Sequence, residues 1–178
     1  GNAPFIVCED ADIDAAVEGA IASKYRNAGQ TCVCANRLFV HDAIYDEFAE
    51  KYAAKVAKMT VGNGADEGVV IGPLITEKAV EKVESQIADA VAKGGRILTG
   101  GKRHEKGGSF FQPTVIADAT REMTVFREET FGPMAPLIRF HSDDEVLEMA
   151  NDSEFGLASY FYSRDISRIW KLAEGLET

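Results

Sequence analysis

The sequence predicts an α/β domain with a largely parallel sheet. Short apolar runs, typical of buried strands, alternate along the chain with longer segments whose apolar residues recur every three or four positions. This alternation is the pattern of a parallel sheet that is covered by helices on both faces. The length of 178 residues suits one domain, and a hydrophobic content of 46% is enough for a sizeable core.

The first third of the chain predicts two strands and two helices. Residues 4–8 form an apolar run that indicates a buried strand, with Cys8 as a small core residue. Asp10 or Asp12 can cap the helix that follows. A second strand is expected at 37–40. The apolar face of the helix after it contains Ile44, Phe48, Tyr52 and Val56.

The middle of the chain predicts a loop, a helix and two strands. A glycine-rich loop is expected at 60–75, and Thr76 begins a third helix. Residues 96–99 and 110–117 predict strands, and Pro113 places the second of them at an edge or a bend of the sheet. The expected apolar face of the third helix contains Val80, Val83, Ile87 and Val91.

The last quarter of the chain continues the alternation. Residues 135–140 and 157–162 are expected to be strands. Ser142 can cap a helix that ends at Asn151, and Asp165 can cap a last helix. No internal repeat or low-complexity segment interrupts the pattern.

Charge and cysteine content argue against some classes of partner. The chain has 19 Lys and Arg against 29 Asp and Glu, and its net charge of −10 argues against nucleic acid and anionic membrane surfaces. No apolar run approaches the roughly 18 residues of a membrane span, and no secretory signal opens the chain. Cys8, Cys32 and Cys34 form an odd set without a disulfide framework, so we expect a reducing, cytoplasmic location.

The position of Cys32 makes it a candidate nucleophile. A helical pattern stops at 27–29, where Gly29 suits a left-handed turn, and a strand is expected at 37–40. Cys32 therefore lies on a short loop between helix and strand, where its side chain can reach a ligand. From spacing alone, a nucleophile and a half-buried small residue both remain open.

Cys34 forms a C-x-C pair with Cys32. A metal site is one interpretation, but a single pair, with His41, His104 and His141 scattered over expected loops, does not predict one. A reversible disulfide is the other interpretation. Residues two apart lie near the outer limit of disulfide Cα separation when the chain is extended, so the loop would have to bend.

Four stretches resemble motifs of the aldehyde dehydrogenase superfamily. The run N-A-G-Q-T-C at 27–32 resembles its nucleophile motif, and the longer run K-Y-R-N-A-G-Q-T-C-V-C-A-N-R at 24–37 is similar to that of the succinate-semialdehyde dehydrogenases. E-E-T-F-G-P at 128–133 resembles the family's nicotinamide-ribose motif. I-G-P-L-I at 71–75 and G-N-A-P-F-I-V at 1–7 are also similar to family segments.

The resemblance implies a fold and a reaction. Residues 1–178 are expected to form a three-layer α/β/α catalytic domain, with the active site facing a cofactor-binding domain that this stretch lacks. The implied reaction is the NAD- or NADP-dependent oxidation of succinate semialdehyde to succinate, through a thiohemiacetal and a thioester on Cys32. Homo-oligomers of the full-length protein, dimers or tetramers, are also implied. The isolated 178 residues are expected to be inactive, because the base that activates water belongs elsewhere.

The resemblance also implies roles for individual residues. Cys32 is the nucleophile, its backbone N–H is one donor to the alkoxide adduct, and Cys34 is its redox partner. Arg26, expected on the last helical turn, pairs with the distal carboxylate of the substrate. Glu129 accepts from the ribose hydroxyls of the cofactor, and Phe131 packs nearby. Without the resemblance, Arg26 and Glu129 would be ordinary surface residues and Phe131 a core residue.

Other interpretations stay open. Glutarate semialdehyde is one methylene longer, a difference worth only about 1–3 kcal/mol in a pocket, so it and other aldehydes are alternative substrates. A non-enzymatic C-x-C thiol switch or metal-binding module, and an inert domain fragment, are alternatives of another class. The sequence separates neither NAD from NADP nor a dimer from a tetramer.

Overall fold

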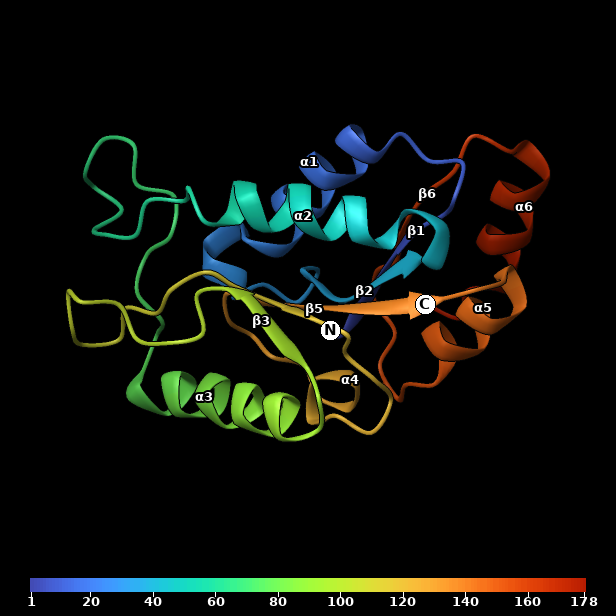
Figure 1. The fold of residues 1–178 in the computed structure, drawn as a ribbon. Coiled ribbons are helices and arrows are strands. Elements are labelled where there is room, and N and C mark those ends of the chain that lie inside the picture. The colour runs from blue at the N-terminus through green and yellow to red at the C-terminus, as the bar shows by residue number, and fades with distance from the viewer.

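A six-stranded sheet forms the centre of the molecule in the computed structural model, which describes all residues 1–178 (Figure 1). The strand order is β3-β4-β5-β2-β1-β6. Neighbouring strands are parallel except β3 and β4, which are antiparallel. The strands are β1 (Ala3–Val7), β2 (Ala35–His41), β3 (Arg96–Thr99), β4 (Thr114–Ala117), β5 (Met134–Phe140) and β6 (Tyr160–Tyr162). The predicted α/β class with a largely parallel sheet is confirmed.

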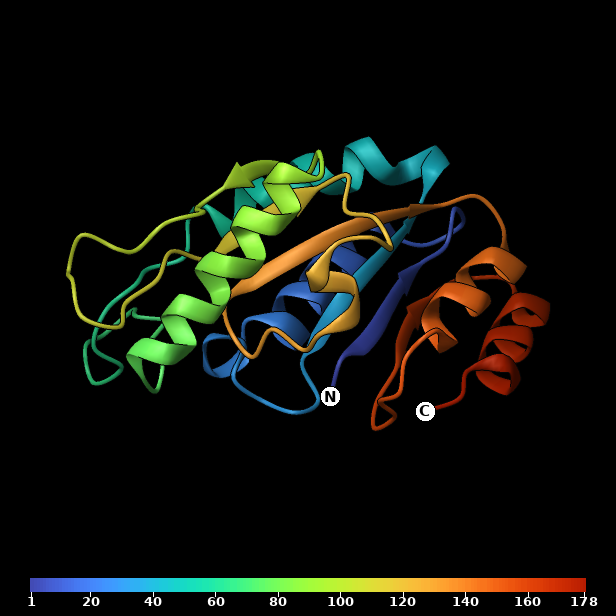
Figure 2. The ribbon, with the colours of Figure 1, turned by 90° about the horizontal axis from the view of Figure 1, so that it is seen from below.

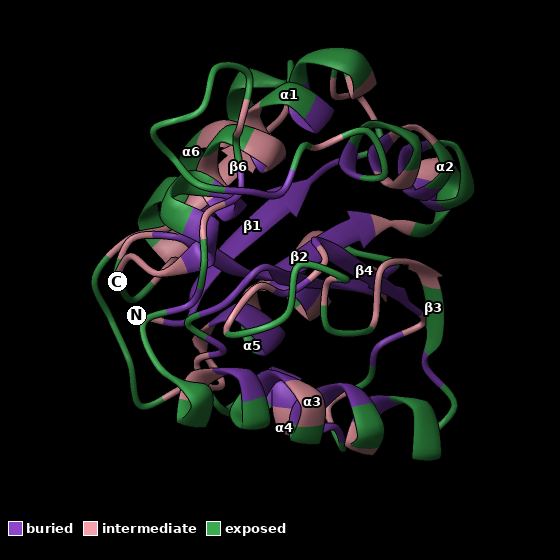
Figure 3. Ribbon diagram, turned by 90° about the vertical axis from the view of Figure 1, so that its left-hand side faces the viewer, coloured by how far each residue is buried: buried purple, intermediate pink, exposed green.

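Helices cover both faces of this sheet. In Figure 3, α1 and α2 lie above the strands, and α3 and α4 lie below them. Figure 2 shows this second face, where α5 and α6 pack together at one side. No helix is both long and apolar enough to cross a membrane. The helices are α1 (Ile13–Lys24), α2 (Tyr45–Val56), α3 (Glu77–Ala92), α4 (Thr124–Arg127), α5 (Asp143–Asn151) and α6 (Ile166–Gly175), with 3₁₀ turns at Arg26–Gly29 and Asp42–Ile44.

The core lies on both sides of the central strands. Every residue of β1 and β4 is buried, and so is nearly every residue of β2 and β5 (Figure 3). Strands that are covered on both faces need near-continuous apolar sequence rather than alternation, which is why short apolar runs predicted them.

Four of the predicted helix starts carry an N-cap in the structure. The side chains of Asp12, Thr76, Ser142 and Asp165 each accept a backbone N–H of the first helical turn. Each such cap stabilises its helix by about 1 kcal/mol relative to alanine. Of the two candidates before α1, Asp12 is the cap, and Asp10 instead accepts hydrogen bonds from the segment that leads into α6.

Two predicted strands are shorter in the structure than expected. The strand expected at 110–117 is β4, which begins at Thr114 and lies inside the sheet between β3 and β5. Pro113 therefore does not mark an edge. It precedes the strand, where its missing N–H removes no hydrogen bond of the ladder. The strand expected at 157–162 is limited to β6, and Leu157 is exposed.

The helices differ from expectation at three places. α1 ends at Lys24, because Asn27 and Ala28 have left-handed φ angles of 49° and 55°. Val91, expected on the buried face of α3, is 46% exposed. The buried stripe of α3 includes Gln86 and Ala90 and leaves Val91 at its rim. The short α4 was not predicted, since a single helical turn carries little periodicity.

Candidate active site

The segments that carry the motifs meet at the amino ends of the parallel strands. Residues 1–2 precede β1, the cysteine pair precedes β2, and residues 128–133 precede β5. A Cβ atom built on Gly1 would lie 3.0 Å from the Cys32 carbonyl oxygen and would overlap the carboxylate of Glu129. Ligands of open α/β sheets usually bind at the carboxyl ends of the strands, so these motifs meet at the less usual end.

Cys32 lies at the centre of a tight turn. The backbone N–H of Cys34 donates to the Thr31 carbonyl at 3.1 Å, which leaves Cys32 and Val33 as the two central residues. Cys32 is exposed, on the loop between helix and strand where it was expected. Its backbone N–H donates to no acceptor of the chain. A thiol and a free N–H donor are therefore presented side by side.

Residues before this turn join three of the motifs. Gly29 has a φ of 76°, and a Cβ atom there would collide with the backbone carbonyl of Gly132. The side chain of Gln30 donates to the Pro73 carbonyl at 3.3 Å and accepts from the Ile75 N–H at 2.9 Å. The nucleophile loop is thus packed against the 128–133 segment and hydrogen-bonded to the 71–75 segment. Only glycine permits the first of these contacts.

The three thiols have different environments. Cys8 and Cys34 are buried, and Cys32 is exposed. Burial raises the pKa of Cys8 to about 12, which makes it a poor nucleophile at neutral pH. The Cys34 sulfur lies 2.7 Å from the Thr31 hydroxyl oxygen and 3.7 Å from the carbonyl oxygen of Arg26. The structure thus leaves one thiol open to a ligand.

Lys24 lies beneath the turn, a placement that the sequence did not predict. Its side chain is fully buried, and its ammonium donates to the Asn36 amide oxygen at 2.9 Å. Asn36 donates in turn to the side chain of Asn2 at 3.1 Å. Burial lowers the pKa of Lys24 to about 8, against the opposing attraction of Cys34 and Glu129. Helical spacing predicts the Lys24 stem on the apolar face of α1, but it does not predict that the ammonium is buried as well.

Glu129 presents its carboxylate beside the cysteine turn. The side chain is 28% exposed. Its backbone carbonyl accepts from the ammonium of Lys82 on α3 at 2.6 Å, and Gln86 donates to the carbonyl of Glu128 at 3.5 Å. α3 therefore fixes the backbone of this segment, while the Glu129 carboxylate lies 3.6 Å from the amino group of Gly1.

Phe131 is not a core residue. Its ring is 38% exposed, and its φ of 51° lies in the left-handed region. A bulky residue in that region costs about 1–3 kcal/mol, and such strain is concentrated at ligand sites. The ring lines a hollow of about 340 Å³ together with Asn27, Gln30, Pro73 and Ile75. An exposed aromatic ring two residues along the chain from Glu129 fits the ribose end of a nicotinamide cofactor.

Arg26 is exposed at the start of the 3₁₀ turn, one residue beyond the C-cap of α1. The expectation that it lies on the last helical turn is therefore wrong. The left-handed residues after it turn the chain away from the helix axis. Arg26 and Val33, the neighbour of Cys32, line the same hollow. Arg26 thus borders a hollow that the nucleophile turn also borders.

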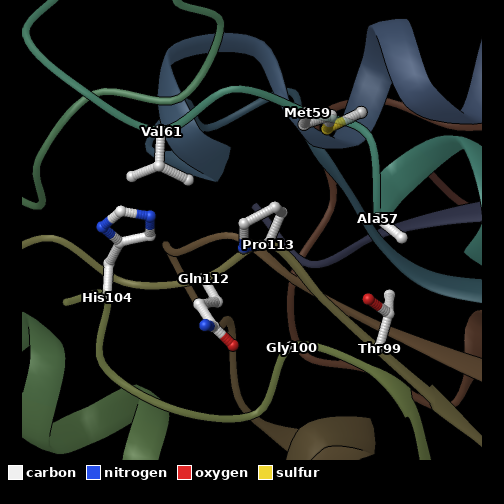
Figure 4. A pocket seen from close by; sticks show the side chains of 8 residues that line it. All are labelled: Ala57, Met59, Val61, Thr99, Gly100, His104, Gln112 and Pro113. Atoms are coloured by element: carbon white, nitrogen blue, oxygen red, sulfur yellow. The ribbon is translucent and has the colours of Figure 1, made fainter.

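Another hollow, shown in Figure 4, contains none of these residues. It is bordered by the end of α2, β3 and the loops at 100–113. Its histidine, His104, accepts a hydrogen bond from the Lys106 N–H at 3.2 Å and so is engaged within its own loop. No group of three or more His, Cys, Asp or Glu side chains is arranged to hold a metal ion. The lining residues are Ala57, Met59, Val61, Thr99, Gly100, His104, Gln112 and Pro113.

Comparison with known proteins gives a family for the chain. The family model described as aldehyde dehydrogenase family matches residues 1–178. The chain is 62% identical over 177 residues to an NADP(+) succinate-semialdehyde dehydrogenase of Escherichia coli, covering 99% of the chain and 37% of that protein. It is 60% identical over 177 residues to a glutarate-semialdehyde dehydrogenase of Pseudomonas aeruginosa, covering 99% of the chain and 37% of that protein.

Solved structures agree with this match. The crystal structure of a succinate-semialdehyde dehydrogenase from Burkholderia pseudomallei superposes with a TM-score of 0.98 and 64% identity, over 99% of this chain and 37% of that one. The chain thus spans little more than a third of the length of these relatives. The family match over every residue, joined to the cysteine turn and the segments packed around it, shows that the chain belongs to the aldehyde dehydrogenase family.

Proposed function

We propose that this chain is the nucleophile-bearing part of an NAD- or NADP-dependent dehydrogenase that oxidises succinate semialdehyde to succinate. One observation carries the proposal. Cys32 is exposed and has a free backbone N–H, the Glu129 carboxylate lies close to its carbonyl oxygen, and the next residue of its turn, Val33, lines a hollow with the exposed Arg26. The thiol supplies the nucleophile, the arginine a carboxylate contact, and the glutamate a contact for a diol.

The chemistry starts at the Cys32 sulfur. Its thiolate adds to the aldehyde carbonyl and forms a thiohemiacetal alkoxide. The free N–H of Cys32 is placed to donate to that alkoxide, and removing one such donor typically costs about 10²–10³ in kcat. Loss of hydride from the adduct leaves a thioester on Cys32, which water then cleaves to release the acid and the thiol. A bound nicotinamide cofactor supplies the hydride acceptor.

Two residues of the chain would hold the cofactor at its ribose end. The Glu129 carboxylate is our candidate acceptor for a vicinal diol, since it is 28% exposed and its one partner is the amino group of Gly1 at 3.6 Å. Lys82 holds the segment through its backbone. The exposed ring of Phe131 offers an apolar surface next to it. Among the relatives, the E. coli protein is named for NADP(+), and a betaine aldehyde dehydrogenase structure is described in complex with NAD+. The chain's own residues favour neither dinucleotide.

Arg26 is proposed to bind the distal carboxylate of the substrate. Three relatives are named for succinate semialdehyde, glutarate semialdehyde and 3-sulfolactaldehyde, and each of these aldehydes carries an anionic group away from its carbonyl. A guanidinium can bind a carboxylate through two parallel hydrogen bonds. Succinate semialdehyde is our first choice, and glutarate semialdehyde, one methylene longer, is the alternative. We also propose a homo-oligomer in a reducing, cytoplasmic compartment, where an exposed Cys32 stays reduced.

A substrate series in the full-length protein tests the proposal. Reduction of NAD and of NADP is followed with succinate semialdehyde, glutarate semialdehyde and butanal, which resembles the first but lacks its charge. We expect kcat/KM for succinate semialdehyde to exceed that for butanal by about 10-fold or more, in line with one charge-assisted contact. A protein that oxidises no aldehyde, or that prefers butanal, contradicts the proposal.

A further inference from the structure

A side chain from the edge of the sheet contacts the centre of the nucleophile turn. The hydroxyl of Tyr160, the first residue of β6, donates to the carbonyl of Val33 at 2.6 Å. Val33 stands between Cys32 and Cys34 in the sequence and is one of the two central residues of the turn. The two partners are 127 residues apart in the chain. The contact therefore depends on the order of the strands.

The other bonds of the loop hold its ends. The Cys34 N–H donates to the Thr31 carbonyl, and the Ala35 N–H donates to the Ser23 hydroxyl at 3.1 Å. Neither of these bonds fixes the Val33 carbonyl. With the ends held, the remaining freedom of the turn is rotation of its central peptide groups, and these carry the Cys32 side chain and N–H. The Tyr160 hydroxyl opposes that rotation.

We infer that Tyr160 is a positioning residue for Cys32, which it acts on through the Val33 carbonyl. The inference rests on the proposed function, in which Cys32 is the nucleophile. Tyr160 touches no reacting atom. Its hydroxyl holds the turn in one conformation, so that the sulfur and the N–H of Cys32 approach an aldehyde together. Catalysis is sensitive to such placement, and a shift of about 1 Å can cost about 10²-fold in rate.

The ring and the hydroxyl of Tyr160 make separate contacts. It packs on Phe5 of β1 with the ring centroids 6.0 Å apart. Replacement by phenylalanine keeps this packing and removes the hydrogen bond alone. One hydrogen bond contributes about 0.5–1.5 kcal/mol, so its loss converts to a fall of about 2- to 12-fold in the ratio of held to released turn.

Tyr162 supplies a matched control. It lies two residues further along β6, so both rings are on the same face of the strand. Its ring also packs on Phe5, with centroids 5.5 Å apart, and its hydroxyl lies over Gly19 of α1 rather than on the turn. Tyr162 lines the same hollow as Tyr160, Val33 and Arg26, so Tyr162→Phe controls for loss of a hydroxyl in that hollow while the bond from Tyr160 to the Val33 carbonyl stays intact.

The experiment compares wild type, Tyr160→Phe and Tyr162→Phe in the full-length enzyme. We measure kcat for succinate semialdehyde, KM for the dinucleotide that wild type uses, NAD or NADP, and the rate at which diamide, which takes up the two thiol hydrogens, closes a Cys32–Cys34 disulfide. Tyr160→Phe should lower kcat by about 2- to 12-fold relative to Tyr162→Phe, with KM for that dinucleotide unchanged. It should also speed disulfide closure several-fold, because the turn is free to bend.

Two results separate this inference from the proposed function. If wild type oxidises the aldehyde and the two variants have equal kcat, the positioning role of Tyr160 is wrong and the proposed function stands. If wild type oxidises no aldehyde, the proposed function fails, and disulfide closure then decides the role of Tyr160. If the Cys32–Cys34 disulfide forms faster in Tyr160→Phe than in Tyr162→Phe, the result supports the restraint of the turn by Tyr160. Equal rates overturn that role.

Discussion

The hydroxyl oxygen of Thr31 lies 2.7 Å from the sulfur of Cys34, inside the turn that presents Cys32. The carbonyl of Arg26 accepts from the same thiol. Both contacts hold Cys34 in the interior, whereas Cys32 is exposed. A disulfide between the two cysteines requires these contacts to break and the turn to bend. A bond formed under such strain is easily reduced, which suits reversible oxidation.

Peroxide should inactivate the full-length enzyme reversibly. The Cys32 thiolate is oxidised to a sulfenic acid while peroxide is reduced to water, and the Cys34 thiol then displaces water to form the disulfide. Dithiothreitol returns both thiols. In Cys34→Ala, Cys32 should proceed to the sulfinic acid, so that activity recovered by dithiothreitol falls well below that of wild type. Cys8→Ala is the control and should recover as wild type does. Full recovery of Cys34→Ala would exclude Cys34 as redox partner.

Iodoacetamide should label Cys32 before the other two cysteines. Cys32 is exposed, whereas Cys8 is buried and its pKa is raised to about 12 by that burial. At pH 8, with limiting reagent, we expect peptide mapping to find Cys32 modified first and Cys8 last. In guanidinium chloride the three cysteines should react at similar rates. Preferential labelling of Cys8 in the folded protein would count against Cys32. Cys32→Ser should abolish turnover and leave the circular dichroism spectrum unchanged.

Arg26→Ala should weaken the binding of a charged aldehyde and leave the oxidation of an uncharged aldehyde almost unchanged. Loss of one bidentate, charge-assisted contact costs about 1.5–3 kcal/mol, so KM for succinate semialdehyde should rise about 10- to 150-fold. Propanal, which has no distal carboxylate, should be oxidised almost as by wild type. Arg26→Lys keeps the positive charge but loses the two parallel hydrogen bonds of the guanidinium. Its KM for succinate semialdehyde should therefore lie between those of wild type and Arg26→Ala. Equal losses on both aldehydes would indicate a structural role for Arg26.

Local features of the sequence predicted local features of the fold. The caps at Asp12, Thr76, Ser142 and Asp165 were predictable because each side chain bonds to its own helix within three residues. Gly29 likewise adopts the left-handed conformation that its position suggested. The motif around Cys32 placed that residue on an exposed loop, as the structure has it.

Long-range features were not predictable from the chain. Nothing near Lys24 in sequence indicates that Asn36 would receive its buried ammonium. The bond from Tyr160 to Val33 depends on the placement of β6 beside β1, which no local pattern specifies. Phe131 was a core residue by composition, and its exposure follows from a left-handed backbone angle that tertiary packing imposes. One feature of the sequence did indicate the location of the site. Motifs stand directly before three strands, and because those strands are parallel the motifs meet at one edge of the sheet.

Asp10 should stabilise the fold in a way that disappears in acid. Burial alone would raise the pKa of this carboxyl, but hydrogen bonds from the Arg164 and Asp165 N–H groups, the Ser163 hydroxyl and Arg168 lower it to about 2. The unfolded value is near 3.8, so the contribution is complete above about pH 4 and is lost as the pH falls through about 2. Asp10→Asn should therefore lower the thermal midpoint at pH 7, and the gap should close towards pH 2.

An exposed acid gives the control for this titration. Asp66, in the glycine-rich loop, is exposed, and Asp66→Asn should have the wild-type thermal midpoint at both pH values. The expected loss for Asp10→Asn at pH 7 is about 1–2 kcal/mol after allowance for screening of a partly exposed cluster. A gap that is as large at pH 2 as at pH 7 would show that packing, and not the charge of Asp10, is responsible.

The isolated 178-residue polypeptide should fold but should not turn over substrate. The strands and their covering helices form a continuous core, so far-UV circular dichroism should report an α/β domain. Glu129 and Phe131 contact at most one end of a cofactor, and orientation supplies much of the rate advantage of such a reaction. Ile75, Ile166 and Trp170 are more than 60% exposed, so the polypeptide should also self-associate. Cofactor titration by calorimetry and NADPH formation from succinate semialdehyde measure the loss. Steady turnover by the isolated polypeptide would mean that these 178 residues contain a complete site.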